Sequence, residues 1–186
     1  DSVDFLQDFK TSFLAEEIYI YTPKGDVKML PVGSTALDFA FDIHSEIGAH
    51  CIGAKVNQKL VPLNHVLKNG DQIEILTSTK QKPSEDWLRF VGSSKAKSKI
   101  KDLLKVERKI IISQGKEIVV RKLKQIKINP SDEVFNQIRA YFDAKTTNDL
   151  FFKIATEEID HTDIKKFQEA RNKQKIDVLK DVHDAK

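Results

Sequence analysis

Cysteine is scarce in this chain of 186 residues, and long apolar runs are absent from it. The single cysteine, Cys51, cannot form an internal disulfide or a zinc site built on several cysteines. No apolar stretch approaches the roughly 20 residues that a membrane-spanning helix needs. The N-terminal residues are acidic and lack the basic and then apolar order of a secretory signal peptide. We therefore expect a protein of the reducing cytoplasm that has no membrane partner.

Recognisable catalytic signatures are missing as well. The sequence has no serine in a nucleophile elbow, no pair of carboxylates in an acid–base context and no glycine-rich nucleotide loop. Residues 22–26 lack the second glycine and the Gly-Lys-Ser/Thr ending of a phosphate loop, so we interpret them as a hairpin turn. His44, His50 and Cys51 have no fourth ligand at a useful spacing, and adjacent strand residues point to opposite faces. We predict no catalytic residue, no metal site and no cofactor.

Positive charge is concentrated in one part of the chain. Residues 77–127 carry fifteen lysines and arginines against five acids, although the whole chain has a net charge of only +3. The three remaining segments are net negative: 1–17 with one base and five acids, 18–76 with five and six, and 128–186 with ten and twelve. Such a concentration favours a polyanionic partner. A solvated helix face explains it equally well.

The part before residue 77 has the pattern of a small α+β domain. Two stretches rich in β-branched and aromatic residues, 18–21 and 27–30, flank a Pro-Lys-Gly-Asp turn and predict a hairpin. Further strands are predicted at 51–56 and 72–76, with a helix between the hairpin and these strands. This order is that of the β-grasp, or ubiquitin-like, arrangement.

The helix between the predicted strands has recognisable ends. Ser34 or Thr35 is placed to cap its N-terminus. Leu37 and Phe41 recur at helical spacing and mark its apolar face. Gly48 is expected to end the helix in the left-handed conformation.

Aromatic side chains are interpreted as core residues in preference to stacking platforms. This applies to Tyr19 and Tyr21 in the first strand and to the eleven phenylalanines. Phe39 and Phe41 are expected to pack on the sheet. Trp87 is expected to anchor a helix that follows it.

The part after residue 79 has helical character. A polar segment with a proline leads to Ser84, a candidate N-cap. An amphipathic helix is predicted from Lys95 onward, with Gly115 as an interruption. Three more helices are predicted, at about 134–142 with Ser131 as a candidate cap, at about 147–155 and from about residue 160.

Four segments of the sequence carry a family resemblance. They read Ile-Tyr-Ile-Tyr-Thr-Pro-Lys-Gly-Asp at 18–26, Leu-Asp-Phe-Ala-Phe-Asp-Ile-His-Ser-Glu-Ile-Gly at 37–48, Ile-Gly-Ala-Lys-Val at 52–56, and Leu-Lys-Asn-Gly-Asp-Gln-Ile-Glu-Ile-Leu at 67–76. They resemble the TGS domain, and more narrowly that of bacterial RelA/SpoT homologues, which make and degrade the alarmone (p)ppGpp. The resemblance is specific over about residues 16–101 and diffuse to about residue 176.

The resemblance implies an α+β architecture, with a TGS β-grasp domain followed by an all-α helical domain. It places the chain in the C-terminal regulatory half of a (p)ppGpp synthetase/hydrolase, or GTP pyrophosphokinase. Catalysis in that family resides in domains N-terminal to TGS, so we expect this fragment to be non-catalytic. The expected divisions are a linker from the missing catalytic domains at 1–16, the TGS domain at 17–79, the helical domain at 80–176 and a tail at 177–186.

The resemblance also implies a role for His44. In this family the histidine at that motif position meets the CCA 3′ end of a deacylated tRNA in the ribosomal A site. An imidazole can stack on an unpaired base and can hydrogen-bond to its edge. Ser45 and Lys55 are expected to belong to the same tRNA-end surface. The competing interpretation is a helix-terminal histidine that interacts only with nearby carbonyls.

The basic run that follows is expected to hold phosphates of tRNA or ribosomal RNA. On a helix, four of its cations share one face, and a phosphate backbone would offset their mutual repulsion. The expected RNA-backbone residues are Lys95, Lys97, Lys99, Lys101, Lys105 and Arg108. Two alternatives remain open: a protein-interaction module for acidic acyl carrier protein or for the parent's own catalytic domains, and a scaffold without a ligand of its own.

Overall fold

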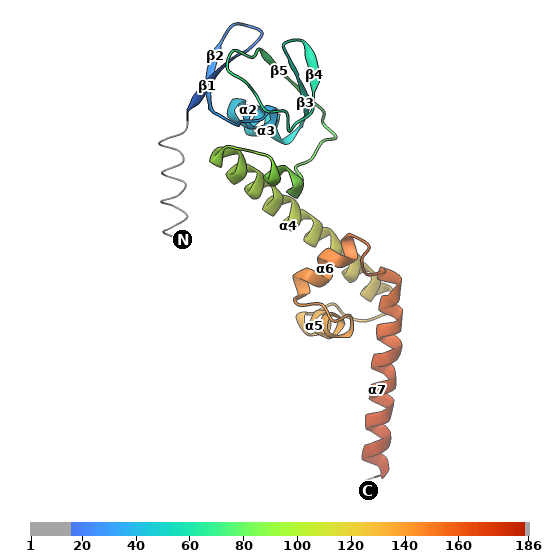
Figure 1. Cartoon of the computed structure of the whole chain (residues 1–186). Helices are drawn as coiled ribbons and strands as arrows, with labels where there is room; N and C mark the ends of the chain where they lie inside the picture. The colour runs from blue at the N-terminus through green and yellow to red at the C-terminus, as the bar shows by residue number, and fades with distance from the viewer. Residues whose placement is uncertain (1–15, 185–186) are drawn as a thin grey trace. The chain divides into compact units, whose positions relative to one another are not determined.

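The computed structural model describes residues 16–184, and the chain divides into two compact units (Figure 1). Unit 1 extends to Lys105, and unit 2 begins at Val106. The predicted linker lies outside the described residues, except for Glu16. The predicted boundary after residue 79 differs from this division, because the segment between residues 80 and 105 packs into unit 1.

Unit 1 contains the predicted β-grasp sheet, which consists of a two-stranded and a three-stranded part. A hairpin of β1 and β2 pairs antiparallel, and β3 pairs antiparallel with both β4 and β5. The strands are β1 (Glu17–Tyr21), β2 (Val27–Pro31), β3 (Cys51–Val56), β4 (Lys59–Val61) and β5 (Ile73–Thr77). A parallel bridge between Tyr21 and Gln72 joins the hairpin to the start of β5. The order of elements expected along the chain, a hairpin, then a helix, then further strands, is therefore confirmed.

Two helices, α2 (Ala36–Ile43) and α3 (Ser45–Ala49), lie against one face of this sheet (Figure 1). Thr35 caps α2 in a reciprocal box, in which the Asp38 carboxylate accepts from the Thr35 amide at 2.8 Å. The prediction that Gly48 ends a single helix is wrong, because the helix breaks at His44 and Gly48 lies inside α3. A Cβ at Gly48 would overlap the ring of Phe41, so the glycine permits a close contact.

The apolar face of the sheet and of α2 forms the core of unit 1. Phe39 packs among the sheet residues, whereas Phe41 faces Trp87 edge to face, with ring centroids 6.4 Å apart. These core predictions are confirmed. The prediction for Tyr19 and Tyr21 is wrong, because their side chains are 47 % and 40 % exposed. Strand alternation gives the inner face of β1 to the isoleucines on either side of Tyr19.

The segment after the sheet is tied to α2 by a second apolar cluster. It comprises a short 3₁₀ helix, η1 (Glu85–Arg89), and the first turns of α4 (Ser94–Gln125). The cluster residues are Leu37, Ala40, Phe41, Cys51, Trp87, Val91, Ala96 and Ile100. This packing is the physical reason why the division falls after Lys105.

A buried carboxylate also fixes the start of α4. Asp38 is 1 % exposed, and its oxygens accept from the amides of Gly92 and Ser93 and from the Ser93 hydroxyl, each at 2.9 Å. The Ser93 oxygen in turn accepts from the Ala96 amide at 3.1 Å and caps the new helix. The carboxylate that completes the α2 cap therefore also positions α4.

Helix α4 continues without a break past Gly115, so the predicted interruption there is wrong. Gly115 is buried, and a Cβ at this position would overlap the backbone carbonyl of Phe151. The glycine therefore allows α4 to approach α6 (Thr147–Ala155) closely.

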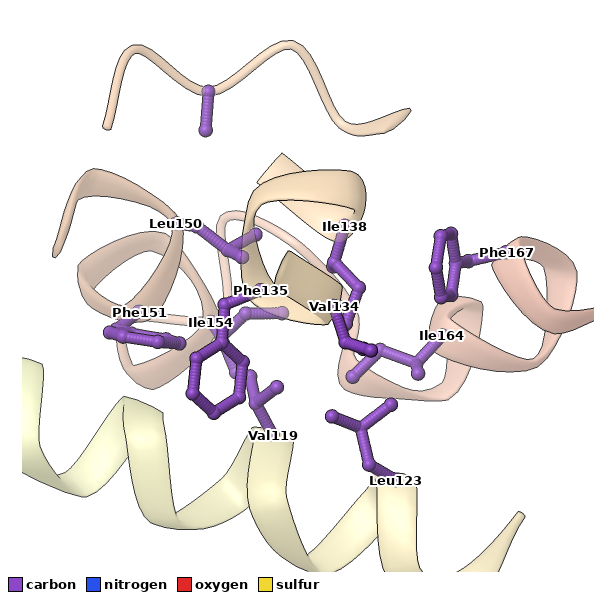
Figure 2. Packing of buried hydrophobic residues seen from close by; sticks show 11 residues of the cluster. Val119, Leu123, Val134, Phe135, Ile138, Leu150, Phe151, Ile154, Ile164 and Phe167 are labelled. Carbon is purple, nitrogen blue, oxygen red and sulfur yellow. The ribbon is translucent and has the colours of Figure 1, made fainter. Parts of the chain in front are cut away.

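Unit 2 is helical and is built around one apolar cluster (Figure 2). Besides the end of α4 and α6 it contains α5 (Asp132–Tyr141), η2 (His161–Asp163) and α7 (Ile164–Asp184). The labelled core residues are Val119, Leu123, Val134, Phe135, Ile138, Leu150, Phe151, Ile154, Ile164 and Phe167. Phe135 and Phe151 meet edge to face, with centroids 5.2 Å apart. The predicted cap at Ser131 is confirmed, whereas the predicted tail after residue 176 is helical as far as Asp184.

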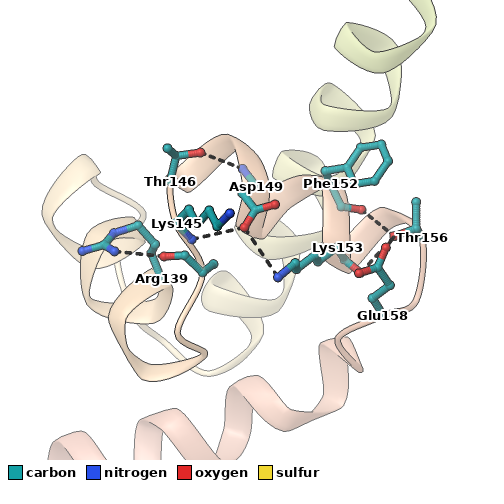
Figure 3. Close-up of polar contacts among 9 residues, drawn as sticks. Arg139, Lys145, Thr146, Asp149, Phe152, Lys153, Thr156 and Glu158 are labelled. Atoms are coloured by element: carbon teal, nitrogen blue, oxygen red, sulfur yellow. Dashed lines mark hydrogen bonds and ion pairs between the residues drawn. The ribbon is translucent and has the colours of Figure 1, made fainter. Parts of the chain in front are cut away.

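Polar contacts fix both ends of α6 (Figure 3). The Asp149 carboxylate accepts from the Lys145 amide at 3.1 Å and pairs with Lys153 at 3.6 Å. Arg139 Nη1 donates to the carbonyl of Ala144 at 3.0 Å and closes the turn before α6.

None of the helices in the described residues is long and apolar enough to span a membrane.

Candidate functional site

His44 lies between α2 and α3 and serves both helices. Its backbone is extended, with φ −164°, and its amide donates to the Ala40 carbonyl at the end of α2. Its Nδ1 accepts from the Glu46 amide at 3.2 Å and so caps α3. In the neutral ring this bond places the proton on Nε2. The side chain is exposed, so Nε2 and the ring faces are available to a ligand while Nδ1 holds the ring in place.

The neighbours of His44 have more local roles. Ser45 is the first residue of α3 and is half-buried. His50 ends α3, with Nδ1 3.3 Å from the Glu46 carbonyl oxygen. Burial raises the pKa of the Cys51 thiol to about 11, although a backbone hydrogen bond at Gly53 opposes this shift. At neutral pH this thiol is protonated and is therefore a poor nucleophile.

Among residues 16–184, no group of three histidine, cysteine, aspartate or glutamate side chains could hold a metal ion.

Lys55 does not lie with His44, contrary to the expectation of a shared surface. Its neighbours in β3, Ala54 and Val56, are buried under α2, and strand alternation turns Lys55 to the helix-free face. There it lines a polar hollow of about 340 Å³ with Pro23, Gln58, Gln72 and Glu74.

The cations expected to bind RNA divide into different groups on α4. Lys97, Lys101 and Lys105 are exposed. Lys99 is half-buried. Lys95 Nζ donates to Asp42 Oδ1 at 3.2 Å, so it attaches α4 to α2. The predicted run is therefore not a uniform phosphate-binding face.

Acidic side chains lie beside two of the exposed lysines. Lys101 and Lys105 line a hollow of about 440 Å³ that Glu85 and Asp86 of η1 also line. Asp86 additionally pairs with Arg89 at 3.5 Å. These carboxylates reduce the local positive potential at two of the expected phosphate contacts.

Arg108 is engaged inside unit 2. Its guanidinium carbon lies 4.2 Å from the centroid of the Phe152 ring, a cation–π geometry. Lys116 lies 5.7 Å from the Phe135 centroid in a similar contact. Spacing along one helix could not reveal these partners, which come from other helices.

Sequence reasoning placed Asp38 in the first turn of its helix but missed the contacts that Asp38 and Asp42 make with the segment around the start of α4. Both organise the start of α4. The spacing of Thr35 and Asp38, a Thr followed three residues later by an acid, carried a signal for the cap. No local pattern indicated the hydrogen bonds from Gly92 and Ser93 to Asp38, since Ser93 lies 55 residues further along the chain.

Comparison with known proteins identifies the family. The TGS domain family matches residues 18–77. The GTP pyrophosphokinase of Myxococcus xanthus is 45 % identical over 130 residues, which cover 69 % of this chain and 17 % of that protein. The guanosine-3′,5′-bis(diphosphate) 3′-pyrophosphohydrolase of Aquifex aeolicus is 41 % identical over 157 residues, which cover 84 % of this chain and 22 % of that protein.

A third relative matches the whole chain. The GTP pyrophosphokinase of Photobacterium angustum is 35 % identical over 211 residues, which cover 100 % of this chain and 28 % of that protein. The chain therefore spans between 17 % and 28 % of the length of these three relatives.

Proposed function

Because this chain contains a TGS domain and is homologous to one part of the RelA/SpoT-type (p)ppGpp synthetases and hydrolases, we propose that it is a non-catalytic sensor region of the stringent response. Its proposed ligand is the CCA 3′ end of a deacylated tRNA on the ribosome. The observation that carries this proposal is the geometry of His44, an exposed ring at a helix junction whose orientation is fixed by its own cap bond.

The fixed ring suits recognition of an unpaired nucleotide. A base can stack on either imidazole face, and Nε2 can donate to an acceptor on the base edge or ribose. Because the Glu46 amide holds Nδ1, less side-chain freedom is lost on binding than for a mobile histidine. A free 3′ hydroxyl fits where an attached aminoacyl group would clash, which gives the discrimination that a starvation sensor needs. Such state-dependent binding could bias a parent enzyme toward synthesis.

Affinity in this proposal comes from the exposed lysines of α4. Lys97, Lys101 and Lys105 follow one another at intervals of four residues on one helix face. Contacts to phosphates release counterions, so each lysine adds binding free energy and a salt dependence. Lys95 and Arg108 contribute less, since Asp42 and Phe152 already engage them.

The decisive experiment separates the capping role of His44 from its recognition role. His44→Ala removes both the cap acceptor and the ring, whereas His44→Asn keeps a good N-cap side chain and removes only the imidazole. We expect His44→Asn to leave the unfolding free energy of unit 1 nearly unchanged. It should weaken binding of deacylated tRNA to the ribosome-bound protein about tenfold, the loss expected from one stacked base.

The matched control is His50→Asn, which removes the histidine at the other end of α3. It should not change tRNA binding. Unchanged binding in both His44→Asn and His44→Ala would exclude this histidine as the tRNA-end contact.

A second candidate is a protein-interaction module, for acyl carrier protein or for the catalytic domains of the parent enzyme. It is favoured by the helix-free face of the hairpin, where Tyr19 lies opposite Met29 and Tyr21 opposite Val27. All four side chains are at least 40 % exposed. Met29→Lys should weaken such a protein complex and spare tRNA binding, whereas His44→Asn should do the reverse.

A further inference from the structure

The end of α4 and the start of α7 enclose a basic hollow that the proposed function does not use. The hollow measures about 190 Å³, the space of several water molecules. It is lined by Lys122, Gln125, Ile126, His161, Thr162, Ile164 and Lys165. Two lysines and a histidine from three separate elements, α4, α7 and η2, thus line one space, and no carboxylate is among the lining residues.

The local folds of both elements hold this hollow together. Helix α4 ends where Lys127 takes a left-handed φ of 59° and the Ile128 amide donates to the Leu123 carbonyl at 2.9 Å. The Gln168 side chain of α7 donates to the Ile126 carbonyl at 3.0 Å. Leu123 and Ile164 are both fully buried in the core beneath. The walls of the hollow are therefore fixed by packing and by a hydrogen bond.

Of the three basic side chains that line the hollow, only His161 has an acidic partner in the part of the chain that the structure describes. Lys122 is half-buried, and among residues 16–184 neither it nor Lys165 has an ion-pair partner. The adjacent Lys166, in contrast, pairs with Asp163 at 2.8 Å. Asp160 Oδ1 lies 3.9 Å from His161 Nδ1 and also accepts from the amide and hydroxyl of Thr162 at 2.8 Å each.

We propose that this hollow binds a phosphate group. Lys122 is half-buried and Lys165 is exposed, and an anion between them would offset the cost of partly burying the charged side chain of Lys122. Ammonium groups and an imidazole form charge-assisted or neutral hydrogen bonds to phosphate oxygens, and the Gln125 amide can donate as well. The phosphate belongs either to an RNA backbone or to a small phosphorylated molecule. The site is independent of His44, which lies in the other unit.

The test uses the full chain and a pair of matched double variants. Lys122→Gln with Lys165→Gln removes both ammonium groups from the hollow. Lys124→Gln with Lys173→Gln removes the same charge from exposed positions on the same two helices outside it. Inorganic phosphate is titrated at constant ionic strength while NMR follows the ring signals of His161.

We expect a saturable shift of the His161 signals in the parent chain and in the Lys124/Lys173 variant. The Lys122/Lys165 variant should bind phosphate at least tenfold more weakly. If that variant proves poorly folded by circular dichroism, Lys165→Gln alone, at an exposed position, should still weaken phosphate binding several-fold. Absence of a saturable shift in the parent chain, or equal weakening in both double variants, would overturn the proposal.

A second arm identifies the source of the phosphate. An RNA duplex without a CCA end is added to the phosphate-bound chain. Displacement of phosphate by the duplex, with weaker RNA binding in the Lys122/Lys165 variant alone, assigns the site to an RNA backbone. Displacement by a nucleoside diphosphate but not by the duplex assigns it to a small molecule. His44→Asn should not alter either titration, so this proposal and the tRNA-end proposal fail separately.

Discussion

The two halves of α4 are both rich in basic residues, but different contacts hold them in place. The first half, up to Lys105, is attached to unit 1 by hydrogen bonds to buried Asp38 as well as by apolar packing. The second half is attached to unit 2 by apolar packing and by the close approach at Gly115. Apolar packing thus holds both parts of this lysine-rich helix, and buried polar contacts are added in unit 1 and a close backbone approach in unit 2.

Because of this difference, the basic residues of α4 have different roles. Exposed side chains are found at Lys95, Lys97, Lys101, Lys105 and Arg108. Lys95 belongs to the attachment of the first half and Arg108 to that of the second, whereas Lys97, Lys101 and Lys105 make no ion pair within residues 16–184. A cluster of cations in sequence is therefore not one functional surface. Experiments that perturb one half at a time can separate attachment from ligand binding.

The chain offers a natural probe for that separation. Trp87 is its only tryptophan and is buried in unit 1. Tryptophan fluorescence therefore follows the unfolding of unit 1, while far-UV circular dichroism follows the helices of both units.

The largest effect is expected for Asp38→Ala. It leaves the buried amide of Thr35 and the partly buried amides of Gly92 and Ser93 without their acceptor. Unsatisfied buried donors cost about 1–3 kcal/mol each, so unit 1 should lose about 4 kcal/mol of unfolding free energy after partial relaxation. Urea titration followed by Trp87 fluorescence measures the loss.

The control for this prediction is Asp42→Ala. It removes only the partly exposed pair with Lys95 and should cost about 0.5 kcal/mol. Similar fluorescence midpoints for the two variants would contradict the role given to Asp38.

The next largest effect is expected in the other unit, for Gly115→Ala. An alanine is normally the better helix former by about 1 kcal/mol. Here its Cβ would overlap the Phe151 backbone, and because a backbone carbonyl cannot move aside easily, unit 2 should lose about 3 kcal/mol.

The expected signature is a lower midpoint by circular dichroism with an unchanged Trp87 fluorescence transition. Gln114→Ala, at the exposed neighbouring position, should leave both transitions in place. A stabilised Gly115→Ala variant would show that α4 and α6 are not in close contact.

A smaller, pH-dependent effect is expected from Cys51 in unit 1. Its thiol has a pKa of about 11 when folded, against an ordinary value of 9.0. Between these pH values the unfolded chain releases this proton and the folded chain retains it, so stability falls as pH rises from about 9 to about 11. The parent chain should lose about 2 kcal/mol relative to Cys51→Ala over this window. Trp87 fluorescence in urea at several pH values measures the difference, and parallel curves for the two proteins would contradict it.

The local features of the fold were predictable from the sequence. Strand alternation predicted the hairpin, and the cap residues Thr35 and Ser131 were recognisable because a cap bonds to amides only two or three residues away. The same alternation places Tyr19 and Tyr21 on the exposed face of β1. The expectation that they are core residues rests on their aromatic character alone and is wrong for this reason.

The remaining features depend on partners far along the chain. Gly48 and Gly115 are glycines because Phe41 and Phe151 approach them, yet a glycine that ends a helix has the same signature in the sequence. The same limit applies to the candidate site. His44 was found through a family resemblance, whereas the pairing of Lys95 with Asp42 spans 53 residues and left no local signal.

The smallest predicted effect tests Arg108, which the sequence predicts to bind RNA and which the structure places over the ring of Phe152. Arg108→Gln removes the cation above the Phe152 ring and should lower the stability of unit 2 by about 1 kcal/mol, as measured by circular dichroism. Lys109→Gln, the exposed neighbour, should not change that stability. In unit 1 we expect the opposite pattern for Lys105→Gln. This variant should weaken tRNA binding and lower the salt dependence of binding by about one counterion, and it should leave folding unchanged. If Arg108→Gln instead lowers the salt dependence and leaves stability unchanged, Arg108 belongs to the phosphate-binding face, and the distinction between the two halves of α4 fails at this residue.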